Sequence, residues 1–154
     1  MNNGRIAVAS VVITAAALVG IAEYEGYTDN AIQPIPGDSW TYGFGETKGV
    51  KQGDKTTPVR ALVQLLDSAE EHAEGVKKCL SGTQLYQHEF DAYLSLAYNI
   101  GVGGFCKSSI PVKIKAGQYL EACKTILLYN RAQGKVIKGL VIRREKEYRT
   151  CIGE

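Results

Sequence analysis

The sequence predicts an α+β fold, in which a small β-hairpin lobe over residues 29–45 accompanies a larger helical lobe. Two patterns support this class: short β-type runs flank the turn PIPGD, and stretches after Thr57 place apolar residues at helical spacing. The chain has 154 residues, of which 45% are apolar and 22% are charged. This size and composition are typical of one globular domain and exclude a disordered or collagen-like chain.

The N-terminal stretch is the uncharged run IAVASVVITAAALVGIA, which follows Arg5 and precedes Glu23 and Glu25. Since a positive flank tends to stay in the cytoplasm, we expect the remainder of the chain to be exported. Three interpretations are open at this point: a signal peptide cleaved near Ala17, a transmembrane helix of marginal length, or a buried helix of the folded domain. The run is rich in Ala and poor in Leu and Phe, so its residence in a membrane would be marginal.

The hairpin is expected next. Residues 31–33 begin its first strand, the Pro- and Gly-rich residues 34–38 form its turn, and residues 40–44 return along the second strand. The polar residues 48–57 are expected to be a loop.

Helices account for most of the chain beyond this loop. Thr57-Pro58 is a good helix start, because Pro is tolerated in the first turn. Thr83 is expected to cap the central core helix, and glycines 101, 103 and 104 to end it in a tight loop. The expected helices cover residues 57–73, 83–98, 109–117, 119–129 and 140–151.

Charge is distributed unevenly along the chain, although the net charge is only +2. Residues 23–75 contain ten acidic and four basic residues, whereas residues 113–149 contain ten basic and three acidic residues. The basic half is compatible with docking on an anionic polymer or with solvated helix faces. A net charge this small does not indicate nucleic acid as a partner, and none is expected.

Four cysteines are present, and they show neither CxxC spacing nor Cys/His zinc spacing, so no metal site is expected. An even number suggests disulfide bonds in an exported protein. Spacing alone leaves all three pairings open. The cysteines are Cys79, Cys106, Cys123 and Cys151.

Three motifs follow one another along the chain: EG…TYGFG, AYNIGVGGFCKSS at residues 97–109 and GKVIKGLVIRREKE at residues 134–147. Together they resemble the signatures of a known family, the phage-type lysozymes. With the apolar N-terminus, the chain resembles in particular the signal-arrest-release endolysins. The residues of the first motif are Glu25, Gly26, Thr41, Gly43 and Gly45.

This resemblance implies a lysozyme-like fold with a catalytic cleft between the two lobes. It also implies a muramidase that cleaves peptidoglycan between N-acetylmuramic acid and N-acetylglucosamine during host lysis, as a monomer without a cofactor. Residues 1–22 would be an uncleaved N-terminal helix that tethers the protein to the inner membrane and is later released, and residues 23–154 would be the catalytic domain. The active protein would then lie in the host periplasm.

Glu25 is the expected general acid. Glycoside cleavage requires a proton on the leaving oxygen, and a free Glu with a pKa of about 4.3 rarely holds one at neutral pH. Partial burial after an apolar helix would raise the pKa of Glu25, whereas an exposed carboxylate at a helix end is the alternative. Thr41 would hold the attacking water. Alternatively, Thr41 is a β-branched residue that is present only because it favours a strand.

The sequence departs from the family between these two residues. Counting along the motif places Pro34 where the family usually carries an Asp, and Pro34 cannot accept a proton. The adjacent Gln33 is the expected water-positioning residue, and Asp38 is its rival, although a turn-forming Asp at the hairpin tip is the simpler interpretation. Without a carboxylate, the alternatives are a lytic transglycosylase or a catalytically impaired, membrane-tethered peptidoglycan-binding protein.

Two further expectations follow from the resemblance. An exported fold implies oxidised cysteines, and we expect the pairs Cys79–Cys106 and Cys123–Cys151. The first pair would join the two ends of the central helix, and the second would join the last two long helices. Asn99 is expected either to contact the sugar or to cap a helix end.

Overall fold

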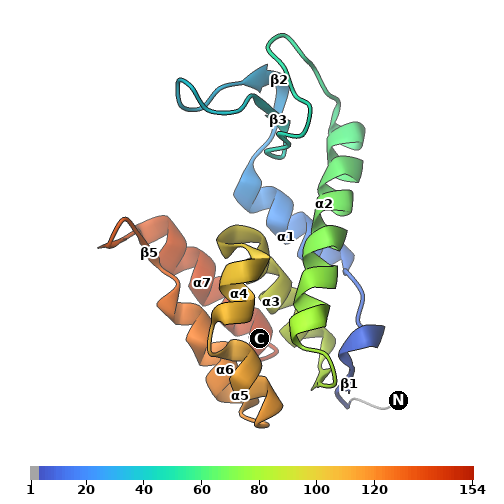
Figure 1. Ribbon diagram of the computed structural model, residues 1–154, viewed down its shortest axis with the longest axis vertical. Helices are drawn as coiled ribbons and strands as arrows, with labels where there is room; N and C mark the ends of the chain where they lie inside the picture. Colours follow the sequence, from blue (N-terminus) through green and yellow to red (C-terminus); the bar gives the residue numbers. More distant parts are fainter. Residues whose placement is uncertain (1–3) are drawn as a thin grey trace. The chain divides into compact units, whose positions relative to one another are not determined.

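The computed structural model describes residues 4–154 and divides into two compact units, which are treated separately below (Figure 1). The helical unit comprises the chain up to Ala17 together with residues His72–Glu154, and the hairpin unit comprises Leu18–Glu71. The division falls within helix α1 (Ala15–Glu25) and helix α2 (Pro58–Cys79). The predicted α+β class is confirmed.

The predicted hairpin forms in the hairpin unit. Strand β2 (Thr28–Ile32) pairs antiparallel with strand β3 (Thr41–Gly43), with Thr28 opposite Gly43 and Ile32 opposite Thr41. The other edge of β2 is also satisfied, because the Ala31 amide donates to the Asp54 carbonyl over 2.8 Å and the Thr56 amide donates to the Asp29 carbonyl over 2.9 Å. The hairpin is therefore supported on both edges of β2.

Strand β3 packs against helix α2. The ring of Tyr42 is buried, and its hydroxyl accepts a hydrogen bond from Gln64 Nε2 over 3.3 Å. Gly43 has a φ of +59°, and a Cβ built on it would lie 2.8 Å from the Ala61 Cβ. Glycine is thus required there both by the backbone conformation and by the close approach of the helix.

The helical unit is built around α3 (Gln87–Ile100), which packs against α7 (Lys138–Cys151) and contributes more buried residues than any other element. This confirms the expected central helix. Its start differs from the expectation, because Tyr86 is the N-cap and its amide donates to Glu89 Oε2 over 2.8 Å. Thr83 is not the cap, since its hydroxyl donates to the Leu80 carbonyl.

Shorter helices complete this unit. Helix α4 (Val102–Lys107) replaces the expected tight loop, because Gly101 with a φ of +86° ends α3 and Phe105 is fully buried. A second short hairpin, β5 (Arg131–Ala132) with β6 (Lys135–Val136), was not expected. The remaining elements are α5 (Ile110–Lys115), α6 (Tyr119–Thr125) and the 3-10 helix η2 (Ile126–Leu128).

In the folded chain, the described part of the N-terminus does not form the single helix that was expected over residues 1–22. Strand β1 (Ile6–Ala7) pairs antiparallel with β4 (Gln84–Leu85), the 3-10 helix η1 (Val8–Ser10) follows, and α1 begins only at Ala15. The reason is that Thr14 caps α1, its Oγ1 accepting the Ala17 amide over 3.1 Å. Residues 1–3 of this expected segment lie outside the described residues, and no helix within 4–154 is both long and apolar enough to cross a bilayer.

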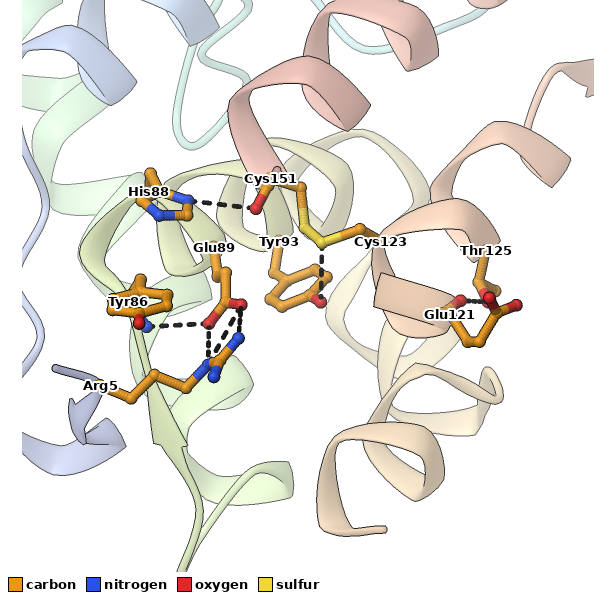
Figure 2. The surroundings of a disulfide bond; sticks show 9 residues. All are labelled: Arg5, Tyr86, His88, Glu89, Tyr93, Glu121, Cys123, Thr125 and Cys151. Atoms are coloured by element: carbon orange, nitrogen blue, oxygen red, sulfur yellow. Dashed lines mark hydrogen bonds and ion pairs between the residues drawn. A yellow bond between two sulfur atoms is a disulfide. The ribbon is translucent and has the colours of Figure 1, made fainter. Parts of the chain in front are cut away.

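Both expected disulfide pairings are confirmed. Cys79 is bonded to Cys106 and Cys123 to Cys151, each with a Cα–Cα distance of 5.7 Å. The Tyr93 hydroxyl lies 3.7 Å from Cys123 Sγ (Figure 2). Burial raises the pKa of Tyr93, so the hydroxyl stays protonated and donates to the sulfur.

Candidate active site

Glu25 is the last residue of α1. The helix ends there because Gly26 adopts a φ of +70° while its amide still donates to the Ala22 carbonyl over 3.1 Å. Glu25 Oε2 lies 3.9 Å from the position that a Cβ on Gly45 would occupy. The structure therefore brings the carboxylate next to the second glycine of the TYGFG motif, where an added methyl group would be in van der Waals contact with it.

Glu25 falls among the exposed residues of the hairpin unit. Around Gly26 the space is open, with no atom within 4 Å of a built Cβ. Neither Gly26 nor Gly45 carries a side chain that could cover the carboxylate. Partial burial of the Glu25 carboxyl in a cleft stays a prediction.

Thr41 and Gln33 are neighbours across the hairpin. Thr41 is half-buried at the start of β3 opposite Ile32, and Gln33 directly follows Ile32 at the end of β2. Gln33 Nε2 donates to the Asp38 carbonyl over 2.6 Å, which fixes the side chain against the loop. Its Oε1 is the atom suited to accept a hydrogen bond from water.

Asp38 is exposed at the hairpin tip, where its amide donates to the Ile35 carbonyl in a turn. This placement agrees with a turn-forming role. The loop therefore contributes the Gln33 amide on the Thr41 side and a carboxylate at its tip.

Asn99 belongs to the helical unit. Its Oδ1 accepts a hydrogen bond from Arg144 Nη2 over 2.8 Å, and the C-cap of α3 is Gly101. Its side chain thus links α3 to α7, a role that the motif did not predict. A contact between Asn99 and sugar remains a prediction.

A buried charge network in the same unit was missed by the sequence analysis. Glu147 is 3% exposed and accepts hydrogen bonds from Ser95 Oγ over 2.6 Å and from Arg143 Nε over 3.1 Å. Arg144 Nε lies 2.9 Å from Glu147 Oε2. Burial raises the pKa of Glu147, and the two arginines and Ser95 counteract this shift.

The spacing of this network is the signal that could have found it. Glu147 follows the two arginines by three and four positions, which places all three side chains on one face of a helix. Because both arginines are buried, that face is the one α7 turns toward the core. The network is a structural support for the last helix.

The described residues contain no group of three or more His, Cys, Asp or Glu side chains suited to hold a metal. Glu46, which follows the TYGFG motif, accepts the Lys48 amide over 2.7 Å and so supports the loop. The candidate catalytic groups of the hairpin unit are the Glu25 carboxyl, the Thr41 hydroxyl and the Gln33 amide, with the Asp38 carboxylate as the rival of Gln33.

Comparison with known proteins decides the family. The family model for phage lysozyme matches residues 22–147, a range that includes Glu25, Thr41 and the α7 network. The chain belongs to the phage lysozyme family. The lysozyme-like fold predicted from the three motifs is thereby confirmed.

Individual relatives agree with this membership. The endolysin of Bacillus phage B103 is 32% identical over 134 residues, covering 82% of this chain and 49% of that relative. The SAR-endolysin of Haemophilus phage HP1 is 29% identical over 145 residues, covering 87% of this chain and 77% of that relative. This phage lysozyme chain thus spans about half the length of the Bacillus phage relatives that it matches.

Among solved structures, the muramidase domain of SpmX from Asticaccaulis excentricus is similar with a TM-score of 0.84 and 27% identity. The match covers 94% of this chain and 99% of that one.

Proposed function

We infer that this chain is an endolysin that degrades peptidoglycan by hydrolysing the β-1,4 bond between N-acetylmuramic acid and N-acetylglucosamine. The inference depends on one observation, the Glu25 carboxyl at the end of α1 beside Gly45 of the family motif. Family membership and the name endolysin on its relatives support it. The reaction serves lysis of the phage host.

In this proposal Glu25 is the general acid. Its proton passes to the glycosidic oxygen as the bond to the sugar breaks, and the anomeric carbon acquires oxocarbenium character. The exposed carboxyl is covered by the bound saccharide, and this loss of water raises the pKa of a carboxyl group. Glu25 thus becomes a competent acid in the complex.

Water completes the reaction at the anomeric carbon. The Thr41 hydroxyl and Gln33 Oε1 can each accept a hydrogen bond from that water, and the bond from Gln33 Nε2 to Asp38 holds the amide in place. Gln33 orients the water but does not remove its proton, which passes to bulk solvent as the water oxygen bonds to the anomeric carbon, while Glu25 regains a proton from solvent. Asp38, at the exposed tip, is the rival candidate for that position.

The proposed location is the host periplasm, after a first stage in which residues 6–22 tether the chain to the inner membrane. The uncharged run after Arg5 and the SAR-endolysin relative support this stage. The folded position of the run, with β1 paired to β4, would be the released state. The chain acts on peptidoglycan as a monomer, and no nucleic acid takes part.

The test is a turbidity assay on permeabilised Gram-negative cells. Glu25→Gln is expected to lower the rate by about 10²–10⁴-fold, the usual contribution of a general acid. Glu23→Gln is the matched control, because it makes the same change at an exposed position of the same helix. Equal rates for Glu25→Gln and the control would exclude the assigned acid.

Product analysis assigns the second residue and the reaction. Hydrolysis yields reducing sugars, whereas a 1,6-anhydro product in mass spectrometry would show a transglycosylase. Thr41→Ala and Gln33→Ala are both expected to slow hydrolysis more than Asp38→Ala does. A larger loss for Asp38→Ala would move the water-positioning role to that carboxylate.

A further inference from the structure

Ile32 is an exposed apolar residue beside the Thr41 hydroxyl. It is the last residue of β2 and lies directly opposite Thr41, the first residue of β3. Opposite residues of an antiparallel pair project to the same face of the hairpin, with Cβ atoms about 4.5–5.5 Å apart. Ile32 and Thr41 therefore share one surface, to which one strand contributes an aliphatic side chain and the other a hydroxyl.

This surface is turned away from α2. Side chains alternate between the two faces of a strand, and Tyr42, which follows Thr41, is buried and bonded to Gln64 of α2. The alternation places Thr41 on the other face, and Ile32 with it, which agrees with the 42% exposure of Ile32. Strand propensity alone would be met as well by a threonine, so it does not explain an aliphatic side chain in water.

The chain around Ile32 is uncharged. Residues 31–37 contain no charged side chain, and Pro34, Ile35 and Pro36 are all exposed. Gln33 is the one polar side chain of this stretch, and its Nε2 is bound to the Asp38 carbonyl. An exposed apolar surface next to candidate catalytic groups is typical of a ligand-binding surface, and this one suits an uncharged apolar group.

We propose that Ile32 determines specificity by packing against the acetamido methyl group of the muramyl residue whose bond is cleaved. The proposal rests on the proposed function, in which the water held by Thr41 adds to the anomeric carbon. The acetamido group is attached to the neighbouring carbon of the same sugar ring, so a side chain beside Thr41 is within its reach. The methyl end of that group is apolar and uncharged, as is the surface around Ile32.

The contact selects against a muramyl residue that has lost its acetyl group. Such a sugar carries an ammonium group on the same carbon, and the ammonium would lose water against a side chain that offers no hydrogen bond. One methyl group more or less in an apolar site changes kcat/KM by about tenfold or more. The chain is therefore expected to cleave the N-acetylated glycan in preference to the de-N-acetylated one.

Ile32→Asp is the informative variant, because other residues that contact the acetyl group could also produce a preference in the wild type. Aspartate cannot pack against the methyl group, and its carboxylate attracts the ammonium. Its ratio of kcat/KM for the N-acetylated glycan to that for the de-N-acetylated glycan is expected to fall by about tenfold or more. Ile35→Asp is the matched control, since it adds the same charge to the same loop at a position that is 62% exposed, and it is expected to keep the wild-type ratio.

The assay measures the release of reducing sugars from sacculi before and after enzymatic removal of the muramyl N-acetyl groups. The same ratio of the two rates in the wild type and in Ile32→Asp would overturn the assignment. An equal change of the ratio in Ile35→Asp would overturn it as well, because the effect would then be that of negative charge anywhere on the loop.

Ile32→Thr covers the case in which Ile32→Asp does not fold. Threonine keeps the β-branched shape that suits a strand but presents a hydroxyl in place of an aliphatic branch. Its ratio is expected to lie below that of the wild type. A wild-type ratio in folded Ile32→Thr would refute the methyl contact.

Binding separates this proposal from the proposed function. In a Glu25→Gln chain, co-sedimentation with the two kinds of sacculi is expected to show the same preference, and adding Ile32→Asp is expected to reduce that preference by about tenfold. If no chain cleaves either substrate but the binding preference still falls, the muramidase assignment fails and the Ile32 contact stands. An unchanged binding preference in the double variant would overturn the contact, whatever the rates of cleavage.

Discussion

Replacing Gly43 by Ala tests the account of how the β2–β3 hairpin is held on α2. Gly43 has a φ of +59°, and the new Cβ would lie 2.8 Å from the Ala61 Cβ, a contact that cannot be kept without movement. Left-handed backbone costs about 1–2 kcal/mol for an L-residue, and overpacking adds about 1–3 kcal/mol. The expected loss in the free energy of unfolding is therefore about 2–5 kcal/mol.

Gly49→Ala is the matched control for this variant. Gly49 has a φ of +74°, but a Cβ built on it meets no atom within 4 Å. It therefore carries the backbone strain alone, at about 1–2 kcal/mol. The difference between the two variants, measured by urea denaturation, isolates the contact with Ala61.

A double-mutant cycle completes this test. Ala61→Gly removes the Cβ that the new methyl group meets and costs about 1 kcal/mol as a helical glycine. Gly43→Ala combined with Ala61→Gly should then be less destabilised than the sum of the single variants, by about 1 kcal/mol or more. Additive losses, or equal losses for Gly43→Ala and Gly49→Ala, would refute the close-approach argument.

Three other predictions concern the helical unit. Replacing both cysteines of either disulfide by Ser is expected to lower the free energy of unfolding by about 3–4 kcal/mol, given sequence separations of 27 and 28 residues; calorimetry of each pair would check this. Arg144→Met is expected to lower the free energy of unfolding by about 3–5 kcal/mol, because it removes a buried partner of Glu147. Arg149→Met, which removes an exposed ion pair with Glu145, is expected to lower it by about 0–1 kcal/mol. Similar denaturation midpoints for the two variants would contradict this. Burial raises the pKa of Asp91 above its ordinary 3.8, so the contribution of Asp91 to the free energy of unfolding is complete below pH 3.8 and is lost as pH rises through the folded-state pKa. In denaturation measured over this pH window, Asp91→Asn should therefore lose less stability with rising pH than the wild type does. The control variant Asp67→Asn should follow the wild type.

The sequence predicted secondary structure best where it is determined by neighbouring residues. Apolar residues at helical spacing predicted α2 and α3, and the turn around Pro34–Asp38 predicted the hairpin. Oxidation of the cysteines followed from the exported fold that the family resemblance implied, and their pairing from where they lie relative to the expected helices. Glycine 101 was correctly predicted to end the central helix, but the helix directly after it was missed, because the burial of Phe105 outweighs the low helix propensity of two glycines.

Long-range partners could not be predicted in this way. The ion pair between Arg5 and Glu89 joins positions 84 residues apart. Strand β1 pairs with β4 although no single hairpin turn connects the two strands in the sequence. The proximity of the Glu25 carboxylate to Gly45 is likewise a contact between positions far apart in the sequence. The catalytic roles of Glu25, Thr41 and Gln33 stay predictions.

Both disulfides lie wholly within residues 79–151, and neither includes a residue of β1. Both bonds can therefore form before β1 pairs with β4. That pairing makes and breaks no covalent bond, so it is reversible and does not itself require reducing or oxidising conditions.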